Sequence, residues 1–198
     1  RYPIMISLAS EAIRDDEIAP LTNYVAAGGI LFVGSSSFTR NTNGTMRPDF
    51  AIGPQMGVNQ PFSGQVQNWI QNSNIVKVVN HRIVNHLPGP FVSLPWILPE
   101  SFEEIPWGVS PNHEYRDTHE MWLAAATDAT IVLAGDLEQY MMVKKYGNGY
   151  FIYYAPFQPL IGHGGWAPGM QSYAIFRNAI EWAFENLNVP VAKLSPWP

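Results

Sequence analysis

The chain has 198 residues, 46% of them hydrophobic and 14% charged, a balance typical of a folded domain with a sizeable core rather than of a disordered segment. Its formal net charge of −5 provides no basic surface for a nucleic-acid backbone, and no apolar run reaches the ~18 residues that a membrane span needs. The sequence has no cysteine, which excludes disulfides, thiolate metal sites and a cysteine nucleophile.

The first predicted elements form a strand–helix–strand unit. Residues 4–8 are a short apolar run of strand length. A helix is expected from residue 15 or 16 to residue 27, because acidic residues begin it, apolar residues recur at helical spacing and a Gly pair follows it. Residues 30–33 read as a second buried strand. The short connections imply a right-handed crossover with parallel pairing.

The middle of the chain has weaker signals. Residues 35–64 are rich in Ser, Asn, Gly and Pro and are expected to be mostly loop, with a short helix around residues 48–56. Residues 75–79 form the next predicted strand. Prolines and tryptophans recur through residues 88–120, which predicts an irregular insertion that packs through its aromatic rings.

Regular structure is expected to return in the last third. Residues 129–135 read as a strand, and residues 140–146 and 150–155 flank Gly-Asn-Gly, which is typical of a β-hairpin. Residues 171–187 carry an apolar stripe at helical spacing and are predicted to form the last helix.

Three segments together resemble the class I glutamine amidotransferase-like superfamily, and in particular the amidotransferase-like domains attached to glycoside hydrolases. The segments are LTNYVAAGGILFVG at 21–34, RPDFAI running to MGV at 47–58, and KYGNGYFIYY at 145–154 followed by NAIEW at 178–182. In those carbohydrate-associated proteins such domains can mediate trimer assembly.

The resemblance implies an α/β fold, a flavodoxin/amidotransferase-like three-layer sandwich with a mostly parallel sheet, to which the hairpin and the Pro/Trp-rich insertion are added. It implies a single domain over residues 1–190 that would lack the family's N-terminal strand and helix. Residues 191–198, with two prolines near the end, are expected to be a linker to a following domain.

The family's nucleophile lies on the sharp turn after the second strand, where a cysteine is exposed and backbone N–H groups face the oxyanion. Ser36 occupies that position here, and Phe38 replaces the second small residue. The histidine expected before the last helix is absent, and His163 follows a few residues later in a Gly-rich loop. A Ser36–His163 pair is one hypothesis; a serine-rich loop that ends a strand is the alternative.

Two further groups of residues are candidates for binding. His113, Asp117 and His119 are weak candidates for a divalent metal site, because imidazoles and carboxylates are common ligands; a solvated mixed-charge loop is the alternative. The loop tryptophans Trp96, Trp107 and Trp166 are candidates for stacking on sugar rings or for a protein interface.

These patterns favour a non-catalytic accessory or assembly domain of a larger, carbohydrate-active protein. A serine hydrolase using Ser36 and His163 and a carbohydrate-binding module using the loop tryptophans remain alternatives. The expected partners are neighbouring domains of the same polypeptide, further copies of the chain, or a glycan. No cofactor is expected, and an extracellular or cell-surface location is favoured over others.

Overall fold

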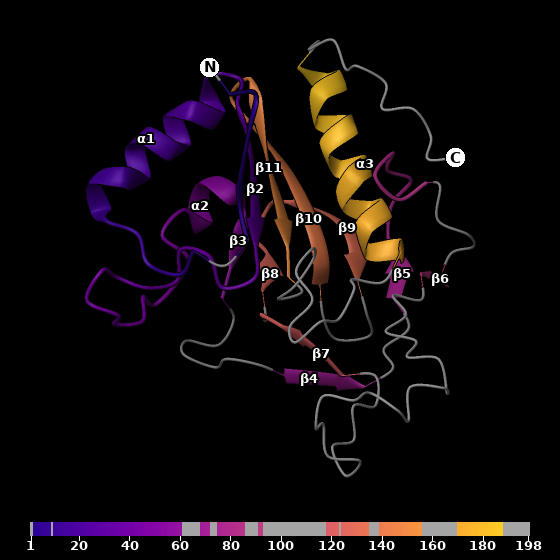
Figure 1. Cartoon of the computed structure of the whole chain (residues 1–198), viewed down its shortest axis with the longest axis horizontal. Helices are drawn as coiled ribbons and strands as arrows, with labels where there is room; N and C mark the ends of the chain where they lie inside the picture. The colour runs from indigo at the N-terminus through magenta and orange to yellow at the C-terminus, as the bar shows by residue number, and fades with distance from the viewer. Residues whose placement is uncertain are drawn as a thin grey trace, which may run out of the picture.

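The computed structural model describes residues 2–8, 10–60, 68–71, 75–85, 91–92, 118–122, 124–134, 139–155 and 170–187. These residues form a mixed α/β fold (Figure 1). Its elements in chain order are β1 (Ile4–Ser7), α1 (Asp15–Ala26), β2 (Ile30–Gly34), α2 (Gly53–Met56), β3 (Val58–Asn59), β4 (Asn68–Gln71), β5 (Ile75–Lys77), β6 (Phe91–Val92), β7 (Thr118–Met121), β8 (Ala125–Ala126), β9 (Thr130–Ala134), β10 (Gln139–Tyr146), β11 (Gly149–Tyr154) and α3 (Met170–Asn186).

The predicted strand–helix–strand unit is confirmed. Strands β1 and β2 pair in parallel, with Ile4 opposite Ile30, and α1 connects them. The Glu17 carboxylate accepts a hydrogen bond of 3.0 Å from the backbone N–H of Arg14, which satisfies a donor at the start of the helix. At the other end the chain leaves the helix through Gly28, whose φ of 101° is readily adopted only by glycine.

The main sheet has the strand order β1-β2-β11-β10-β9-β5-β6. Strands β1, β2 and β11 are parallel neighbours, and the pairings from β11 through β6 are antiparallel. Five strands, β1, β2, β11, β9 and β6, therefore run in the same direction, while β10 and β5 run in the opposite one. The predicted hairpin is β10–β11, in which Tyr146 lies opposite Gly149 across a two-residue turn.

Helices lie on both sides of this sheet: α1 and α2 on one side and α3 on the other (Figure 1). Ring contacts along β11 follow the same division, because successive side chains of a strand point to opposite faces. The Tyr150 ring lies 4.8 Å from that of Trp182 in α3, whereas the Tyr153 ring lies 5.3 Å from that of Phe50, near α2. Strand β2 is buried on both faces, as expected for a strand between helices.

Two predicted elements are shorter than the sequence suggested. The helix expected around residues 48–56 is limited to Gly53–Met56, because Pro54 enters at its start and Gly57 turns left-handed with a φ of 71° directly after it. The strand expected at 75–79 ends at Lys77, and the Val78 side chain beyond it is exposed.

The predicted irregular insertion at residues 88–120 contains two short strands among its described residues. Strand β6 pairs with β5 at the edge of the main sheet. Strand β7 begins in the insertion and pairs with β4 in a separate two-stranded sheet. Among the helices that the structure describes, none combines the length and apolar character needed to cross a bilayer.

Candidate functional site

The turn after β2 lies at the carboxyl edge of the parallel strands. The backbone N–H of Ser35 donates to the carbonyl of Tyr154, at the end of β11, over 2.8 Å. The Ser7 hydroxyl, at the end of β1, donates to the Ser37 hydroxyl over 3.1 Å. The turn thus joins the ends of three strands, at the edge where open α/β sheets bind their ligands.

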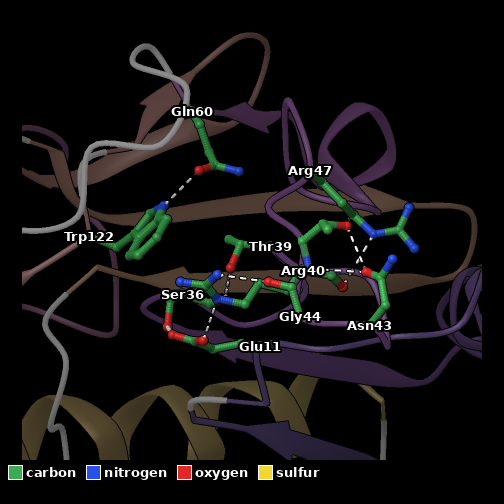
Figure 2. A network of polar contacts seen from close by, with 10 residues as sticks. Glu11, Ser36, Thr39, Arg40, Asn43, Gly44, Arg47, Gln60 and Trp122 are labelled. Carbon is green, nitrogen blue, oxygen red and sulfur yellow. Dashed lines mark hydrogen bonds and ion pairs between the residues drawn. The ribbon is translucent and has the colours of Figure 1, made fainter.

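Ser36, the predicted nucleophile position, is fully buried, with 0% of its surface exposed. Its hydroxyl donates a hydrogen bond of 2.9 Å to Oε1 of Glu11, and the other carboxylate oxygen of Glu11 accepts one of 2.8 Å from Nε of Arg40 (Figure 2). Arg40 also donates through Nη1 to the carbonyl of Gly44 over 2.9 Å. The hydroxyl therefore ends a chain of charged and polar contacts that ties the turn to the loop after it.

The described acceptor of the Ser36 hydroxyl is a carboxylate and not an imidazole. A catalytic serine needs a base that removes its proton, and a carboxylate is a much weaker base than an imidazole. The carboxylate here is also engaged by the Arg40 guanidinium at 2.8 Å. Among the described residues, the Ser36 hydroxyl therefore donates to a carboxylate that is also paired with Arg40.

The backbone N–H groups of Ser37 and Phe38 in the turn also donate hydrogen bonds within the fold. In nucleophile turns the N–H of the residue after the nucleophile helps to bind the oxyanion. Here the N–H of Ser37 donates to the Gly34 carbonyl over 3.1 Å, and that of Phe38 donates to the Ser10 carbonyl over 2.9 Å. The positive φ angles fall on Ser35 (49°) and Phe38 (66°), rather than on Ser36.

The buried phenol of Tyr153 forms a hydrogen bond with the turn. Its hydroxyl donates a hydrogen bond of 2.9 Å to the carbonyl of Ser35, and complete burial raises the pKa of Tyr153 well above its ordinary value. The Thr39 hydroxyl donates to the carbonyl of Ser36 over 2.6 Å. Side chains therefore take up the carbonyl groups that the turn leaves outside the sheet ladder.

The segment around Arg47, one of those that carry the resemblance, connects the loop to the start of α1. Nη2 of Arg47 contacts Oδ1 of Asp15 at 2.6 Å and the carbonyl of Ile13 at 3.0 Å. Its Nε donates to the carbonyl of Arg40 over 3.3 Å. The loop after the turn is thus held at both ends by guanidinium groups.

A second polar contact lies beyond this loop. Nε1 of the buried Trp122 donates to Oε1 of Gln60 over 3.2 Å (Figure 2), and the backbone N–H of Gln60 donates to Oδ1 of Asp49 over 2.8 Å. The Trp122 backbone N–H donates to the carbonyl of Ala155, just after β11. This indole is therefore a buried anchor and not a surface ring.

Most of the predicted site residues lie outside the described residues: His163, Trp96, Trp107, Trp166, His113 and Asp117. His119 lies in β7, where its backbone is paired with Ile70 of β4. Within the described ranges, no three His, Asp or Glu side chains gather into a group that could hold a metal ion. The predicted metal and tryptophan sites therefore stay predictions.

Sequence reasoning missed the acceptor of the Ser36 hydroxyl, Glu11, and the ion pair that Glu11 forms with Arg40. Glu11 and Arg40 are 25 and 4 residues from Ser36 in the sequence, and neither belongs to a recognisable motif. The contact of Trp122 with Gln60 joins residues 62 positions apart and had no local signal either.

No family model matches this sequence, and no curated protein matches it. Solved structures with a similar fold include a cold-adapted β-galactosidase from Rahnella sp. R3, with a TM-score of 0.63 and 14% identity over 100% of this chain and 24% of that one. A GH42 β-galactosidase from G. stearothermophilus has a TM-score of 0.58 and 13% identity over 96% of this chain and 22% of that one. A cytoplasmic protein from Salmonella typhimurium has a TM-score of 0.56 and 14% identity over 91% of this chain and 71% of that one.

At such low identity these likenesses establish a shared fold. The chain spans about a quarter of the length of the β-galactosidase chains that it matches. A small α/β domain of this fold therefore occurs as part of larger β-galactosidase chains. The relationship to class I glutamine amidotransferases stays a prediction.

Proposed function

We propose that this chain is a non-catalytic accessory or assembly domain of a larger carbohydrate-active protein, built on a flavodoxin/amidotransferase-like three-layer sandwich. The observation that carries the proposal is the state of Ser36. Its hydroxyl is buried and bonded to the Glu11–Arg40 ion pair, in a chain that has no cysteine. A position that would hold a reactive thiolate in an active amidotransferase holds a structural hydroxyl here.

The size of the chain relative to its structural neighbours supports the accessory role. It corresponds to 22–24% of the two β-galactosidase chains described above, so a domain of this fold is a minor part of those proteins. The helices on both sides of the sheet support the three-layer arrangement (Figure 1). The relative size of the chain and the positions of its helices both support the proposal independently of the identity of any catalytic residue.

The first strand supports a role in assembly. Strand β1 forms an edge of the main sheet, and its adjacent Met5 and Ile6 are 39% and 45% exposed. Because neighbouring residues of a strand point to opposite faces, apolar side chains are uncovered on both faces at this edge. Soluble proteins usually cover or charge such an edge, since it otherwise offers free backbone donors and acceptors to another chain.

Light scattering coupled to size-exclusion chromatography tests this proposal. We expect the chain to form a defined oligomer, and we expect Ile6→Lys to weaken it by placing a charge at the β1 edge. Val78→Lys is the matched control, because Val78 is 48% exposed and lies after β5, away from β1 in the sheet order. A strict monomer, both alone and within the full-length polypeptide, would contradict the assembly role.

The two alternatives have their own tests. A serine hydrolase requires that Ser36→Ala abolish turnover of ester or amide substrates, with His163 as the base. A carbohydrate-binding module requires that oligosaccharides change the fluorescence of Trp96, Trp107 or Trp166. We expect neither signal, and either one would replace the accessory role with the corresponding activity.

A further inference from the structure

The loop between Arg40 and Arg47 contains a sequence motif for covalent modification. The proposed function makes no use of this motif. Asn43-Gly44-Thr45 is an Asn-x-Thr triplet with a residue other than proline in the middle, which is the acceptor sequence for N-linked glycosylation. It is the single Asn-x-Ser/Thr triplet of this kind in the 198 residues. From its geometry we infer that Asn43 is an N-glycan acceptor when the chain is exported from the cell.

The triplet lies where a bulky glycan can be attached. Asn43, Gly44 and Thr45 are all exposed. The loop begins at Arg40, which bridges to Ala12, and it ends near Arg47, which contacts Asp15 at the start of α1. A glycan at Asn43 would therefore extend from an exposed loop, whereas the turn at Ser36 is buried.

The side chains of the triplet are already arranged around one another. Oδ1 of Asn43 accepts a hydrogen bond of 2.7 Å from the Thr45 hydroxyl and one of 3.0 Å from the Thr45 backbone N–H. Both donors bind the oxygen, so the amide nitrogen, Nδ2, is left without a protein partner in this described loop. Among the residues that the structure describes, the nitrogen that would carry the sugar therefore has no competing hydrogen bond.

The rest of the loop holds this arrangement in place. The Asn41 side chain donates from Nδ2 to the Thr45 hydroxyl over 2.9 Å, and the Asn41 backbone N–H donates to the Thr45 carbonyl over 2.9 Å. Arg40 donates to the Gly44 carbonyl over 2.9 Å (Figure 2). Gly44 has a φ of 82°, which a glycine adopts without strain.

The reaction is a group transfer with a lipid-linked oligosaccharide diphosphate as the co-reactant and an oligosaccharyltransferase as the catalyst. Nδ2 of Asn43 attacks the anomeric carbon of the first sugar and forms a C–N bond. The bond from that carbon to the diphosphate oxygen breaks, and the lipid diphosphate leaves with the electron pair. One proton of Nδ2 passes to a base of the transferase, and no oxidation or reduction occurs.

Translation of the full chain behind a secretory leader, in the presence of eukaryotic microsomes, tests the inference without requiring a folded product. We expect one glycosylated species, which digestion with a peptide N-glycosidase returns to the unmodified mass with Asn43 converted to aspartate. Asn43→Gln and Thr45→Ala should abolish the modification, whereas Thr45→Ser should keep it. Asn41, two residues away and outside any triplet, is an internal control that should stay unmodified.

The same peptide from the protein isolated from its own cells then decides whether the site is used. A hexosamine-linked Asn43 in that protein supports the inference. Unmodified wild-type chain in microsomes, or a glycan that persists in Thr45→Ala, overturns it. An unmodified Asn43 in the exported native protein also overturns it.

Discussion

Glu11 and Ser36 are 25 residues apart in the sequence, and a hydrogen bond of 2.9 Å joins the Glu11 carboxylate to the Ser36 hydroxyl. The segment between β1 and α1 and the turn after β2 are thereby connected by side chains, outside the pairing of the sheet strands. Arg40 completes the connection from the following loop. Two connections of the fold thus meet at this contact: Glu11 comes from the one between β1 and α1, and Ser36 and Arg40 come from the one after β2.

Removal of the Glu11 carboxylate should destabilise the fold through this connection. In Glu11→Ala the buried Ser36 hydroxyl loses its acceptor, and Arg40 loses its partner. A buried donor left without an acceptor costs about 1–3 kcal/mol, while a half-exposed ion pair adds little. Urea unfolding should show a lower midpoint with an unchanged slope.

Ser36→Ala is the matched control for this prediction. It removes the donor but leaves the Glu11–Arg40 pair intact, so its cost should be about 1 kcal/mol and smaller than that of Glu11→Ala. Equal midpoints for Glu11→Ala and the wild type would show that the connection does not contribute to stability.

A second prediction concerns the close approach of the β10–β11 hairpin to the end of α1. A Cβ added at Gly149 would collide with the backbone carbonyl oxygens of Gly29 and Val25. Backbone atoms cannot move aside as a flexible side chain can, so Gly149→Ala should cost about 3 kcal/mol in the free energy of unfolding.

Gly44→Ala provides the comparison for that measurement. No described residue lies within 4 Å of a Cβ at Gly44, so its φ of 82° is what opposes a side chain there. The expected cost is about 1–2 kcal/mol. If Gly44→Ala destabilised the protein more than Gly149→Ala, the steric account of the hairpin would be wrong.

The elements that the sequence predicted well are those with a local cause. α1 was predicted within about one residue, because its acidic start and its glycine end act on the adjacent backbone. The hairpin followed from Gly147 and Gly149, since a two-residue turn needs a residue that adopts a positive φ, and Gly147 has a φ of 58°. Both signals operate over a few residues.

The parts that escaped prediction depend on distant partners. The neighbours of β9 in the sheet are β10 and β5, and nothing in residues 130–134 specifies which strand lies on either side. Ser36 could be placed on its turn from the sequence, but its acceptor, Glu11, could not, because a carboxylate before a helix reads equally well as a solvated residue. The sequence thus predicted where the turn after β2 lies, but not which residues surround Ser36.

A third prediction follows from His81, whose ring lies 5.0 Å from that of Trp182 and whose Nδ1 accepts a hydrogen bond of 3.3 Å from the backbone N–H of Ile83. Burial lowers the pKa of His81 below its ordinary value of 6.5. The folded state therefore favours the neutral ring. This contribution is fully present above pH 6.5 and is lost as the pH falls through the lowered pKa of the folded state.

His81→Phe keeps a ring against Trp182 but cannot titrate. Between about pH 7.5 and about pH 5, the free energy of unfolding should fall more steeply for the wild type than for this variant. The remaining histidines are common to both proteins, so the difference in slope isolates His81. Parallel slopes in urea titrations at several pH values would contradict this account.

The last prediction concerns Tyr153, whose buried hydroxyl donates to the carbonyl of Ser35 over 2.9 Å. Tyr153→Phe leaves that carbonyl without the phenol, so it should cost about 1–3 kcal/mol at neutral pH. Tyr150→Phe, on the same strand but facing α3, should cost less, since its ring contact with Trp182 does not need the hydroxyl.

The same residue should determine part of the alkaline stability. Burial raises the pKa of Tyr153, so the folded state keeps the neutral phenol while the unfolded chain ionises at about pH 10. The stabilising contribution is therefore present below about pH 10 and is lost as the pH rises toward the raised value of the folded state. The wild type should lose stability more steeply than Tyr153→Phe between about pH 9 and about pH 11, because only the wild type must bury this titrating group. The free energy of unfolding of both proteins can be measured with urea across that interval. Equal decreases in the two proteins would mean that the folded state does not keep the Tyr153 phenol neutral.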